Sequence, residues 1–313
     1  MVDDSEFDYI SWIKEQTKHG KNVLVGIGDD ASVIDIGSGR KLVVTTDTVI
    51  EGVHCRLEDG AVLIGRKSLA VSISDLAAMG CPADYCVIAA TLTKDTPRDF
   101  ADDIYRGIRT IADVYKVDLV GGDVTTGKGP LSITTTVFGI AEGLEPVLRT
   151  GSQVGDAICV TGSLGGSLRG KHLRFEPRLT AGIELNRTFQ VTSMIDISDG
   201  LVQDLAHLIE HRAFHGADIF AEAVPVSDDA RALEADDGKS ALEHALHDGE
   251  DFELCFTCSE TVAQALVEGG VCGVSVSRIG TITDSGAIRL LKKGEAPSIL
   301  SPDGYVHRFG QDG

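Results

Sequence analysis

The hydrophobic and polar positions of the chain alternate between a helical and an extended period, which predicts a mixed α/β protein. Apolar residues recur with helical spacing over four segments, 5–19, 62–79, 98–115 and 199–214. Short apolar or alternating runs typical of strands lie between them, at 23–27, 41–47, 85–93, 117–122, 131–140, 157–162, 193–198, 251–257 and 276–282. The two kinds of segment do not alternate strictly, and the runs within 24–36 and 42–47 are predicted to pair antiparallel. We therefore expect an α/β protein of the α+β type rather than a doubly wound parallel sheet.

A stretch rich in turn residues, AEGLEPVLRTGSQVGD (141–156), divides the chain almost evenly and predicts a boundary between two domains. We place the N-terminal domain at residues 1–145 and the C-terminal domain at residues 146–313. The segment 226–250 is polar and acid-rich, and we expect it to be a solvated helix-and-loop excursion from the second domain.

The composition is that of a globular protein and restricts the classes of partner. The chain has 313 residues, of which 42% are hydrophobic, enough to build a sizeable core. Its formal net charge of −20 argues against nucleic acid or an anionic membrane as a partner, because both favour basic patches. No apolar run reaches the length of a membrane span and no secretory signal is evident, so we expect a cytoplasmic location.

Seven cysteines are scattered along the chain, which predicts reduced thiols in such a compartment. Cys255 and Cys258 form a CxxC motif. The surrounding run alternates like a strand, however, and residues three apart in a strand point to opposite faces. We expect buried strand cysteines rather than a metal or redox site.

Aspartates stand at the ends of apolar elements rather than in surface charge runs. Asp29 and Asp30 follow a strand-like run in GIGDDASV, and the others are Asp47, Asp75, Asp123, Asp196 and Asp199. A carboxylate in such a place must be paired or well hydrogen-bonded, because burying it alone costs several kcal/mol. Few basic residues lie nearby in the sequence, and Mg²⁺ prefers carboxylate oxygens, so the set predicts a magnesium site. The alternative, a helix cap or turn residue, fits Asp199 and Asp29 individually.

Two further patterns are interpreted as structural. GDVTTGKG (122–129) approaches the P-loop pattern but lacks its final Ser or Thr, and a strand follows where a helix is needed. We expect a flexible hairpin-like loop with Lys128 exposed. His207, His211 and His215 recur on one helical stripe, which is more typical of a helix surface than of a metal site.

The motifs GIGDDASV, TTDTVIEGVH, SDLAAMGCP, GGD, IDISDGL and GEDFEL occur in this order, and with them the chain resembles the thiamine-monophosphate kinases over about residues 5–310. That family belongs to the ATP-binding superfamily of aminoimidazole ribonucleotide synthetase, selenophosphate synthetase and a hydrogenase-maturation protein. The resemblance implies a two-domain fold in which the N-terminal sheet joins that of a partner in a homodimer and the C-terminal α/β domain lies over the cleft. It also implies γ-phosphoryl transfer from ATP to thiamine monophosphate, assisted by several Mg²⁺ ions.

Roles for particular residues follow from the resemblance by motif position. The implied Mg²⁺ ligands are Asp30, Thr46, Asp47, Asp75, Asp123, Asp196 and Asp199. The implied nucleotide contacts are Thr45, Tyr105, Gly122, Asp123, Arg149 and Ser198. The implied contacts to the thiamine substrate are His54, Glu250 and Tyr305. The groups expected to act in catalysis are Asp47, Asp123, Asp199 and Arg149.

The implied reaction agrees with these residue types. The acceptor is a phosphate monoester with a second pKa of about 6, so near neutral pH it is already an anionic nucleophile and needs no general base. The site must hold two mutually repelling phosphates in line and neutralise their charge, which metal ions on aspartates, together with Arg149, can do. Tyr305 is a candidate aromatic partner for a cationic thiazolium, and core packing is the preferred interpretation of Trp12.

Three features depart from the family pattern and concern the substrate pocket and the nucleotide loop. Gly166 in LGGSLRGK stands where an acid is common, GGDVTT is one residue longer than the usual turn, and Cys55 follows His54 in place of an aromatic residue. Two alternatives stay open. One is another enzyme of the superfamily acting on a different phosphorylated or small-molecule substrate, although no cysteine precedes Cys55 as selenophosphate synthesis would require. The other is a non-catalytic nucleotide-binding regulator.

Overall fold

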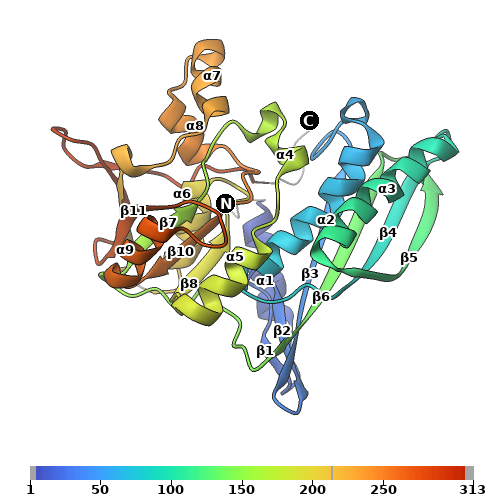
Figure 1. Ribbon diagram of the computed structural model, residues 1–313, viewed down its shortest axis with the longest axis horizontal. Coiled ribbons are helices and arrows are strands. Elements are labelled where there is room, and N and C mark those ends of the chain that lie inside the picture. Colours follow the sequence, from blue (N-terminus) through green and yellow to red (C-terminus); the bar gives the residue numbers. More distant parts are fainter. Residues whose placement is uncertain (1–4, 213, 307–313) are drawn as a thin grey trace.

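The computed structural model describes residues 5–212 and 214–306, whose strands form two separate sheets with helices packed against them (Figure 1). The last strand of the first sheet ends at Glu142, and the first strand of the second sheet begins at Ala157. The turn-rich stretch 141–156 therefore connects the two sheets. This architecture confirms the expected mixed class of the α+β type.

The first sheet has six strands in the order β1-β2-β3-β6-β4-β5. Every neighbouring pair is antiparallel except β4 with β5, and the antiparallel pairing of β2 with β3 confirms the one expected from the sequence. The strands are β1 (Val23–Val25), β2 (Ser32–Gly37), β3 (Arg40–Ile50), β4 (Tyr85–Thr93), β5 (Asp118–Gly127) and β6 (Ser132–Glu142).

Helix α2 (Ala61–Ala78) packs against one face of this sheet. Side chains alternate along each strand, so Val43 and Val49 of β3 are buried on the side of the helix. On the opposite face, Thr46 of β3 and Tyr85 of β4 are exposed. The strand β3 thus presents a buried row toward α2 and an open row on the other side.

The backbones of α2 and α3 (Arg98–Tyr115) touch where the two helices cross. A Cβ atom added to Gly65 would lie 2.0 Å from the carbonyl oxygen of Ile104, and one added to Gly107 would lie 2.0 Å from that of Val62. No side chain can fit at such distances. Two glycines on facing helices therefore set how closely α3 approaches α2.

The second sheet has seven strands in the order β13-β12-β9-β11-β7-β10-β8, antiparallel except for β9 with β12. Helices α6 (Leu201–Ile209) and α8 (Ala241–His247) pack on one face, and α5 (Leu179–Glu184) and α9 (Glu260–Gly269) on the other. The strands are β7 (Ala157–Thr161), β8 (Ser193–Asp196), β9 (Gly216–Phe220), β10 (Leu254–Cys258), β11 (Val276–Thr283), β12 (Ile288–Leu291) and β13 (Ser298–Ile299). The remaining helical segments are α1 (Glu6–Gln16), η1 (Leu57–Asp59), η2 (Ser167–Arg169), α4 (Lys171–Arg174), η3 (Leu185–Phe189), η4 (Ala221–Ala223) and α7 (Asp228–Asp237).

The four predicted helices are present as α1, α2, α3 and α6, while strands β9, β12 and β13 lie outside the predicted runs. The segment 226–250 contains α7, which projects at the top of the view in Figure 1, and α8 below it. Helix α7 is mostly solvated as expected, whereas α8 buries Ala245 and Leu246 against the second sheet. Among the helices of the described residues, none combines the length and apolar character that crossing a membrane requires.

The two cysteines of the CxxC motif lie on opposite faces of β10, as predicted. Cys255 belongs to the cluster beneath α6 and Cys258 to the cluster beneath α9, and both are buried. Burial raises the pKa of the Cys255 thiol above its ordinary range. An inert, protonated thiol in the core follows from this position.

Two interpretations of local sequence are wrong. Strand β5 continues to Gly127, and β4 separates it from β6, so 122–129 is not a hairpin-like loop; Lys128 is nevertheless exposed, as expected. Trp12 is not a core residue, because its side chain is 55% exposed on α1 and stacks on Tyr9 with ring centroids 5.8 Å apart. Helix α1 has no buried residue, so its apolar positions do not enter the core.

Candidate functional site

A cavity of about 1010 Å³ is lined by residues from both sheets and from the loops that follow their strands. Twelve of the residues singled out in the sequence line it: Asp30, Thr45, Thr46, Asp47, His54, Asp75, Arg149, Asp196, Ser198, Asp199, Glu250 and Tyr305. They come from segments up to 275 residues apart in the chain. The fold therefore gathers most of the predicted site into one place.

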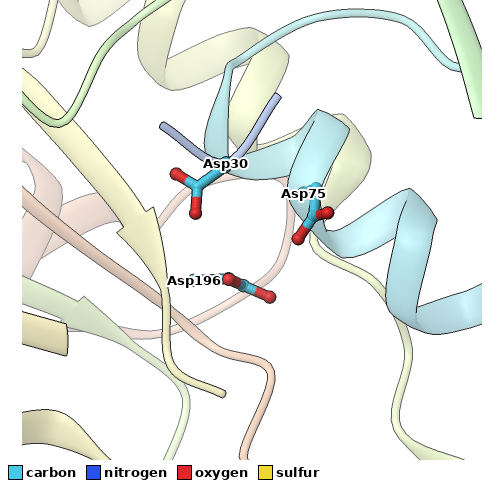
Figure 2. Close-up of side chains that lie close together, drawn as sticks. All are labelled: Asp30, Asp75 and Asp196. Carbon is cyan, nitrogen blue, oxygen red and sulfur yellow. The ribbon is translucent and has the colours of Figure 1, made fainter. Parts of the chain in front are cut away.

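Three carboxylates meet on one side of this cavity. Asp30 comes from the loop after β1, Asp75 from α2 and Asp196 from the end of β8, and Figure 2 shows their side chains arranged around a common space. One oxygen atom from each lies within 4.8 Å of the others. Three like charges at this separation repel one another unless a cation or protons neutralise them.

The environment of this cluster opposes charge. Burial, followed by repulsion from Asp30, raises the pKa of Asp196 from 3.8 to about 8. Burial, followed by repulsion from Asp47, raises the pKa of Asp75 well above its ordinary value. Hydrogen bonds offset this only in part: Ser74 Oγ donates to Asp196 Oδ2 at 2.5 Å, and the Thr45 hydroxyl donates to Asp75.

One buried oxygen of the cluster is left without a partner. Asp30 Oδ2 is inaccessible to solvent and accepts no hydrogen bond within the part of the chain that the structure describes. A divalent cation coordinated by carboxylates would provide the missing interaction, and aspartate oxygens are the ligands that Mg²⁺ prefers. The donor set therefore fits a magnesium ion.

Asp47 and Thr46 are neighbours on β3 but point to opposite faces. Asp47 lies on the α2 side, where Ser72 Oγ donates to its Oδ2 at 2.8 Å, and burial raises its pKa. Thr46 lies on the open side, with its hydroxyl 3.0 Å from that of Thr136. Asp47 therefore extends the carboxylate cluster through its side chain, whereas the Thr46 hydroxyl is directed away from it.

Arg149 pairs with the cluster through Asp30. Its Nη2 atom lies 2.6 Å from Asp30 Oδ1, and its backbone N–H donates to the carboxylate of Asp29. Burial, followed by repulsion from Asp30, raises the pKa of Asp29 to about 7. Asp29 also accepts the N–H of Asp30 at 3.0 Å, so it shapes the turn, while Asp30 is the member of the pair that joins the three-carboxylate cluster.

A further acid of the cavity, Asp204 in the first turn of α6, was not among the predicted site residues. It is 2% exposed, lines the cavity, and accepts the N–H groups of Asp199 and Gly200, each at 3.1 Å. Burial, followed by repulsion from Asp199, raises its pKa well above the ordinary value. The sequence IDISDGLVQD contains the signal, an acid within the apolar start of a helix. Asp204 holds the loop that carries Asp199.

His54, Glu250, Tyr305 and Phe252 also line the cavity. The N–H of Tyr305 donates to the carbonyl oxygen of Asp199 at 3.2 Å, which holds the C-terminal segment at the cavity. A buried lysine without a signal in the sequence, Lys67, lines the cavity as well. The cavity thus combines a cluster of carboxylates with other polar and aromatic side chains.

His207 also reaches the cavity, in contrast to the expectation that its helical stripe is only surface. Its ring centroid lies 5.1 Å from that of Phe7 in α1, and its Nε2 atom is buried with no partner among residues 5–212 and 214–306. His211 is exposed and does not line the cavity. The three histidines therefore do not form a common metal site.

Three predicted residues lie away from the cavity. Tyr105 is 49% exposed on α3, and Gly122 and Asp123 belong to β5, the edge strand at the right of Figure 1. Asp123 is in the same row as Thr48 of β3, across β4 and β6. Three strand spacings place it roughly 14 Å from β3. A single chain does not bring these three residues to the carboxylate cluster.

Beneath the loop that carries Glu250, two buried acids are fully paired. Arg178 donates two hydrogen bonds of 2.7 Å to Glu253, and Lys171 Nζ lies 3.2 Å from Asp251 Oδ1. Hydrogen bonds from Arg178, together with the charge of Lys171, lower the pKa of Glu253 despite its burial. These pairs fix the start of β10 against the loop after β7.

Gly166 has a structural reason for replacing the acid common at this position. Its φ is +74°, and an added Cβ would lie 2.6 Å from the backbone nitrogen of Ala230. Its own N–H donates to Asp248 Oδ2 at 2.9 Å. The loop is built on a glycine here, with the carboxylate supplied by another segment.

Comparisons with known proteins show which family the chain resembles. The family model described as AIR synthase related protein, N-terminal domain, matches residues 28–141. The thiamine-monophosphate kinase of Rhodopirellula baltica is 38% identical over 96% of this chain and 97% of its own length, and that of Bacillus subtilis is 33% identical over 96% and 99%.

Solved structures give the same result for the fold. One described as AaThiL complexed with AMPPCP and TMP has a TM-score of 0.82 at 27% identity and covers 97% of each chain. The thiamine-monophosphate kinase of Stenotrophomonas maltophilia has a TM-score of 0.71 at 34% identity, covering 93% of this chain and 97% of that one. A hydrogenase-maturation complex, HypE–HypF, shares the fold at 16% identity, with a TM-score of 0.72 and coverage of 93% and 98%.

Proposed function

The chain belongs to the thiamine-monophosphate kinase family, and we infer that it transfers the γ-phosphoryl group of ATP to thiamine monophosphate, giving thiamine diphosphate and ADP. The observation that carries this inference is the convergence of twelve motif residues on one cavity, among them the carboxylates and His54 and Glu250. A cluster of acids accommodates metal-bound phosphates, and the polar and aromatic side chains of the cavity provide contacts for a heterocycle.

We propose that Asp30, Asp75 and Asp196 hold Mg²⁺, with Asp47 and Asp199 beside them. The unpartnered buried oxygen of Asp30 and the raised pKa values of Asp75 and Asp196 support this proposal. When bound, the metal ions supply the positive charge that lets two phosphate groups approach.

The protein groups then act by binding and positioning. The acceptor phosphate needs no general base, since it is already anionic near neutral pH. The Arg149 guanidinium, 2.6 Å from Asp30 Oδ1, stands close enough to the carboxylate cluster to pair with a phosphate oxygen. His54, Glu250 and Tyr305 hold the thiamine end, so that the acceptor oxygen lies in line with the bond that breaks.

We propose a homodimer in which the partner completes each site. The edge strand β5 supports this, because Val120 is 60% and Val124 70% exposed, and an unpaired hydrophobic edge favours association. Dimerisation along this edge would bring Asp123 of β5 to the cavity of a second copy. Tyr105 and Gly122, which also lie outside the cavity of their own chain, would be supplied in the same way.

Mixing two inactive variants tests this arrangement. In a heterodimer of Asp47→Asn and Asp123→Asn chains, one of the two sites contains only native residues if Asp123 acts in the partner's cavity. Random exchange of subunits is then expected to restore roughly a quarter of the wild-type activity. A monomer by light scattering, or no recovery after demonstrated exchange, contradicts the proposal.

The reaction is tested with purified protein, ATP, MgCl₂ and thiamine monophosphate. Equal amounts of ADP and thiamine diphosphate are expected, and no ADP above background when the acceptor is omitted. Absence of thiamine diphosphate at high enzyme concentration, with turnover of another phosphorylated acceptor, overturns the assignment. We also place the enzyme in the cytoplasm, a proposal supported by its seven free cysteines.

A further inference from the structure

Lys67 is a lysine with a completely buried side chain at the wall of the cavity. Its relative exposure is 0%, although it belongs to α2, whose other inward positions are mostly apolar or small. Its Nζ atom donates to the carbonyl oxygen of His54 at 2.6 Å and to Glu250 Oε1 at 2.5 Å. The ammonium group therefore joins two segments that belong to opposite halves of the chain.

The ion pair between Lys67 and Glu250 contributes little net free energy to the stability of the fold, because its groups lose hydration. Removing the Lys67 ammonium group from water costs several kcal/mol, and the Glu250 side chain, 20% exposed, loses part of its hydration as well. Well-packed apolar residues often stabilise a protein as well as a buried ion pair does. The pair lies at the cavity rather than in the centre of a core, since Lys67, His54 and Glu250 all line the cavity. This position indicates a role at the site.

The backbone of Glu250 is held in an unusual conformation as well. Its φ is +63°, a left-handed value that a residue with a Cβ rarely adopts, and its N–H donates to the carbonyl oxygen of Ser198 at 2.7 Å. The backbone and Lys67 thus restrain the side chain from two directions. Only Oε1 is engaged, and Glu250 Oε2 accepts no hydrogen bond from the described residues.

We propose that Lys67 is a positioning residue for the acceptor substrate: it fixes the carboxylate of Glu250 so that Oε2 faces the cavity and accepts a hydrogen bond from an N–H group of the substrate's heterocycle. The ammonium group balances the charge of the carboxylate, so that Glu250 recognises an N–H donor by direction rather than by net charge. The exocyclic amine of an aminopyrimidine is such a donor. This inference rests on the proposed function.

The test replaces Lys67 by Met, which has a similar length and no charge. The Kd for thiamine monophosphate, measured by calorimetry, and the KM for it are expected to rise about tenfold or more, because Glu250 loses the contact that orients it. The KM for ATP is expected to stay within twofold, since the carboxylate cluster is unchanged. Lys67→Arg retains the charge and the donors and is expected to recover part of the affinity.

Ser68→Ala is the matched control. Ser68 is the next residue of α2 and is 1% exposed, but its hydroxyl donates only to the carbonyl oxygen of Gly65 at 2.8 Å, and it does not line the cavity. This variant should leave both Kd and KM unchanged. An equal loss of affinity in Ser68→Ala and Lys67→Met would assign the effect to the packing of α2 and overturn the proposal.

A double-mutant cycle separates positioning from folding. Lys67→Met alone leaves Glu250 unpaired and can unfold the protein, whereas Lys67→Met with Glu250→Gln removes both charges. The double variant is expected to bind thiamine monophosphate within threefold of Glu250→Gln alone. A further tenfold loss in the double variant, or unchanged affinity in a folded Lys67→Met protein, overturns the role of Lys67.

The same measurements distinguish this inference from the function on which it rests. A wild-type protein that forms no thiamine diphosphate refutes the proposed function. If the wild-type protein turns over and Lys67→Met retains its KM for thiamine monophosphate, the function stands and the role of Lys67 is refuted.

Discussion

Replacing Asp196 by Asn is expected to stabilise the metal-free protein and to remove most of its stabilisation by Mg²⁺. Asp196 is 3% exposed and shares a space within 4.8 Å with oxygens of Asp30 and Asp75. Without a cation, the folded state must keep this carboxyl protonated or accept the repulsion of its neighbours. Asn has nearly the same shape as Asp but carries no charge and takes up no proton. The substitution therefore separates what the carboxylate contributes to metal binding from what it contributes to the stability of the fold.

The magnitude follows from the pKa of Asp196, which rises from 3.8 to about 8 in the folded protein. At pH 7 the folded state holds a proton that the unfolded chain has lost. Each pH unit above the ordinary pKa of 3.8 costs about 1.4 kcal/mol, which amounts to roughly 4 kcal/mol at pH 7. The amide oxygen of Asn can still accept the hydrogen bond that Ser74 Oγ donates. Allowing for relaxation of the cluster, we expect the free energy of unfolding to rise by about 1–4 kcal/mol.

The assay is urea unfolding at pH 7, first with a chelator and then with increasing MgCl₂. Wild-type stability should rise with metal concentration by the amount that binding to the folded state alone provides, about 2.7 kcal/mol at one hundred times the Kd. The unfolding free energy of Asp196→Asn should be higher than that of the wild type in chelator. It should increase little with MgCl₂, because the variant lacks one of the three carboxylate ligands.

Glu253→Gln is the control, because it is expected to change the free energy of unfolding in the opposite direction. Glu253 is equally buried at 1% exposure, but its partners Arg178 and Lys171 lower its pKa. Its neutralisation leaves Arg178 without its carboxylate partner, although Lys171 keeps Asp251, and should destabilise the protein by roughly 2–4 kcal/mol. If Asp196→Asn is also destabilised in chelator, or if it keeps the full response to Mg²⁺, the assignment of Asp196 to a metal cluster is refuted.

Three further outcomes are expected. Asp47→Asn should abolish turnover. Its far-UV circular dichroism should match that of the wild type, and its urea midpoint in chelator should equal or exceed the wild-type midpoint. A fully active variant would show that Asp47 is not a metal ligand. The metal-free wild-type protein should lose stability as the pH rises from about 4 to 8. The pKa values of Asp196 and Asp29 are raised to about 8 and about 7 in the folded protein, so the folded state binds more protons than the unfolded chain over this pH range. Saturating MgCl₂ should flatten this slope, and an equally steep slope in its presence contradicts the linkage. Trp12→Ala should change the free energy of unfolding by less than about 0.5 kcal/mol and leave KM unchanged, because the ring is 55% exposed and does not line the cavity; a tenfold change in KM would place Trp12 in the site.

The elements with long periodic patterns could be predicted from the sequence, as could some short strands such as β1 and β8, whereas β12 and β13 could not. Helices α2 and α3 span 18 residues each, so several turns repeat the apolar spacing. Strands β12 and β13 span four and two residues and pair through contacts made elsewhere in the chain. A run this short carries no period, and only the neighbouring strands make it extended.

The acids of the site carry a local signal in the sequence, whereas His54, Glu250 and Tyr305 were expected only from the resemblance to the family. Asp30, Asp75 and Asp196 each interrupt an apolar run, which is a local signal. Lys67 is hidden within a helix pattern, and its meaning depends on Glu250, 183 residues away. The sequence also cannot show that β4 and β6 separate Asp123 from β3, since strand order is a property of the whole sheet.

The glycine crossing of α2 and α3 has a consequence for how this sequence can vary. Gly65 and Gly107 are not among the residues that line the cavity, yet α2 carries Lys67 two positions after Gly65 and Asp75 further along. A methyl group at either position would push the helices apart and displace α2, which carries both Lys67 and Asp75 to the cavity. In a saturation-mutagenesis map selected for growth, positions 65 and 107 should therefore be as intolerant as the aspartates. The two groups would differ in soluble yield, because the glycine variants lose the protein itself and the aspartate variants lose only its chemistry.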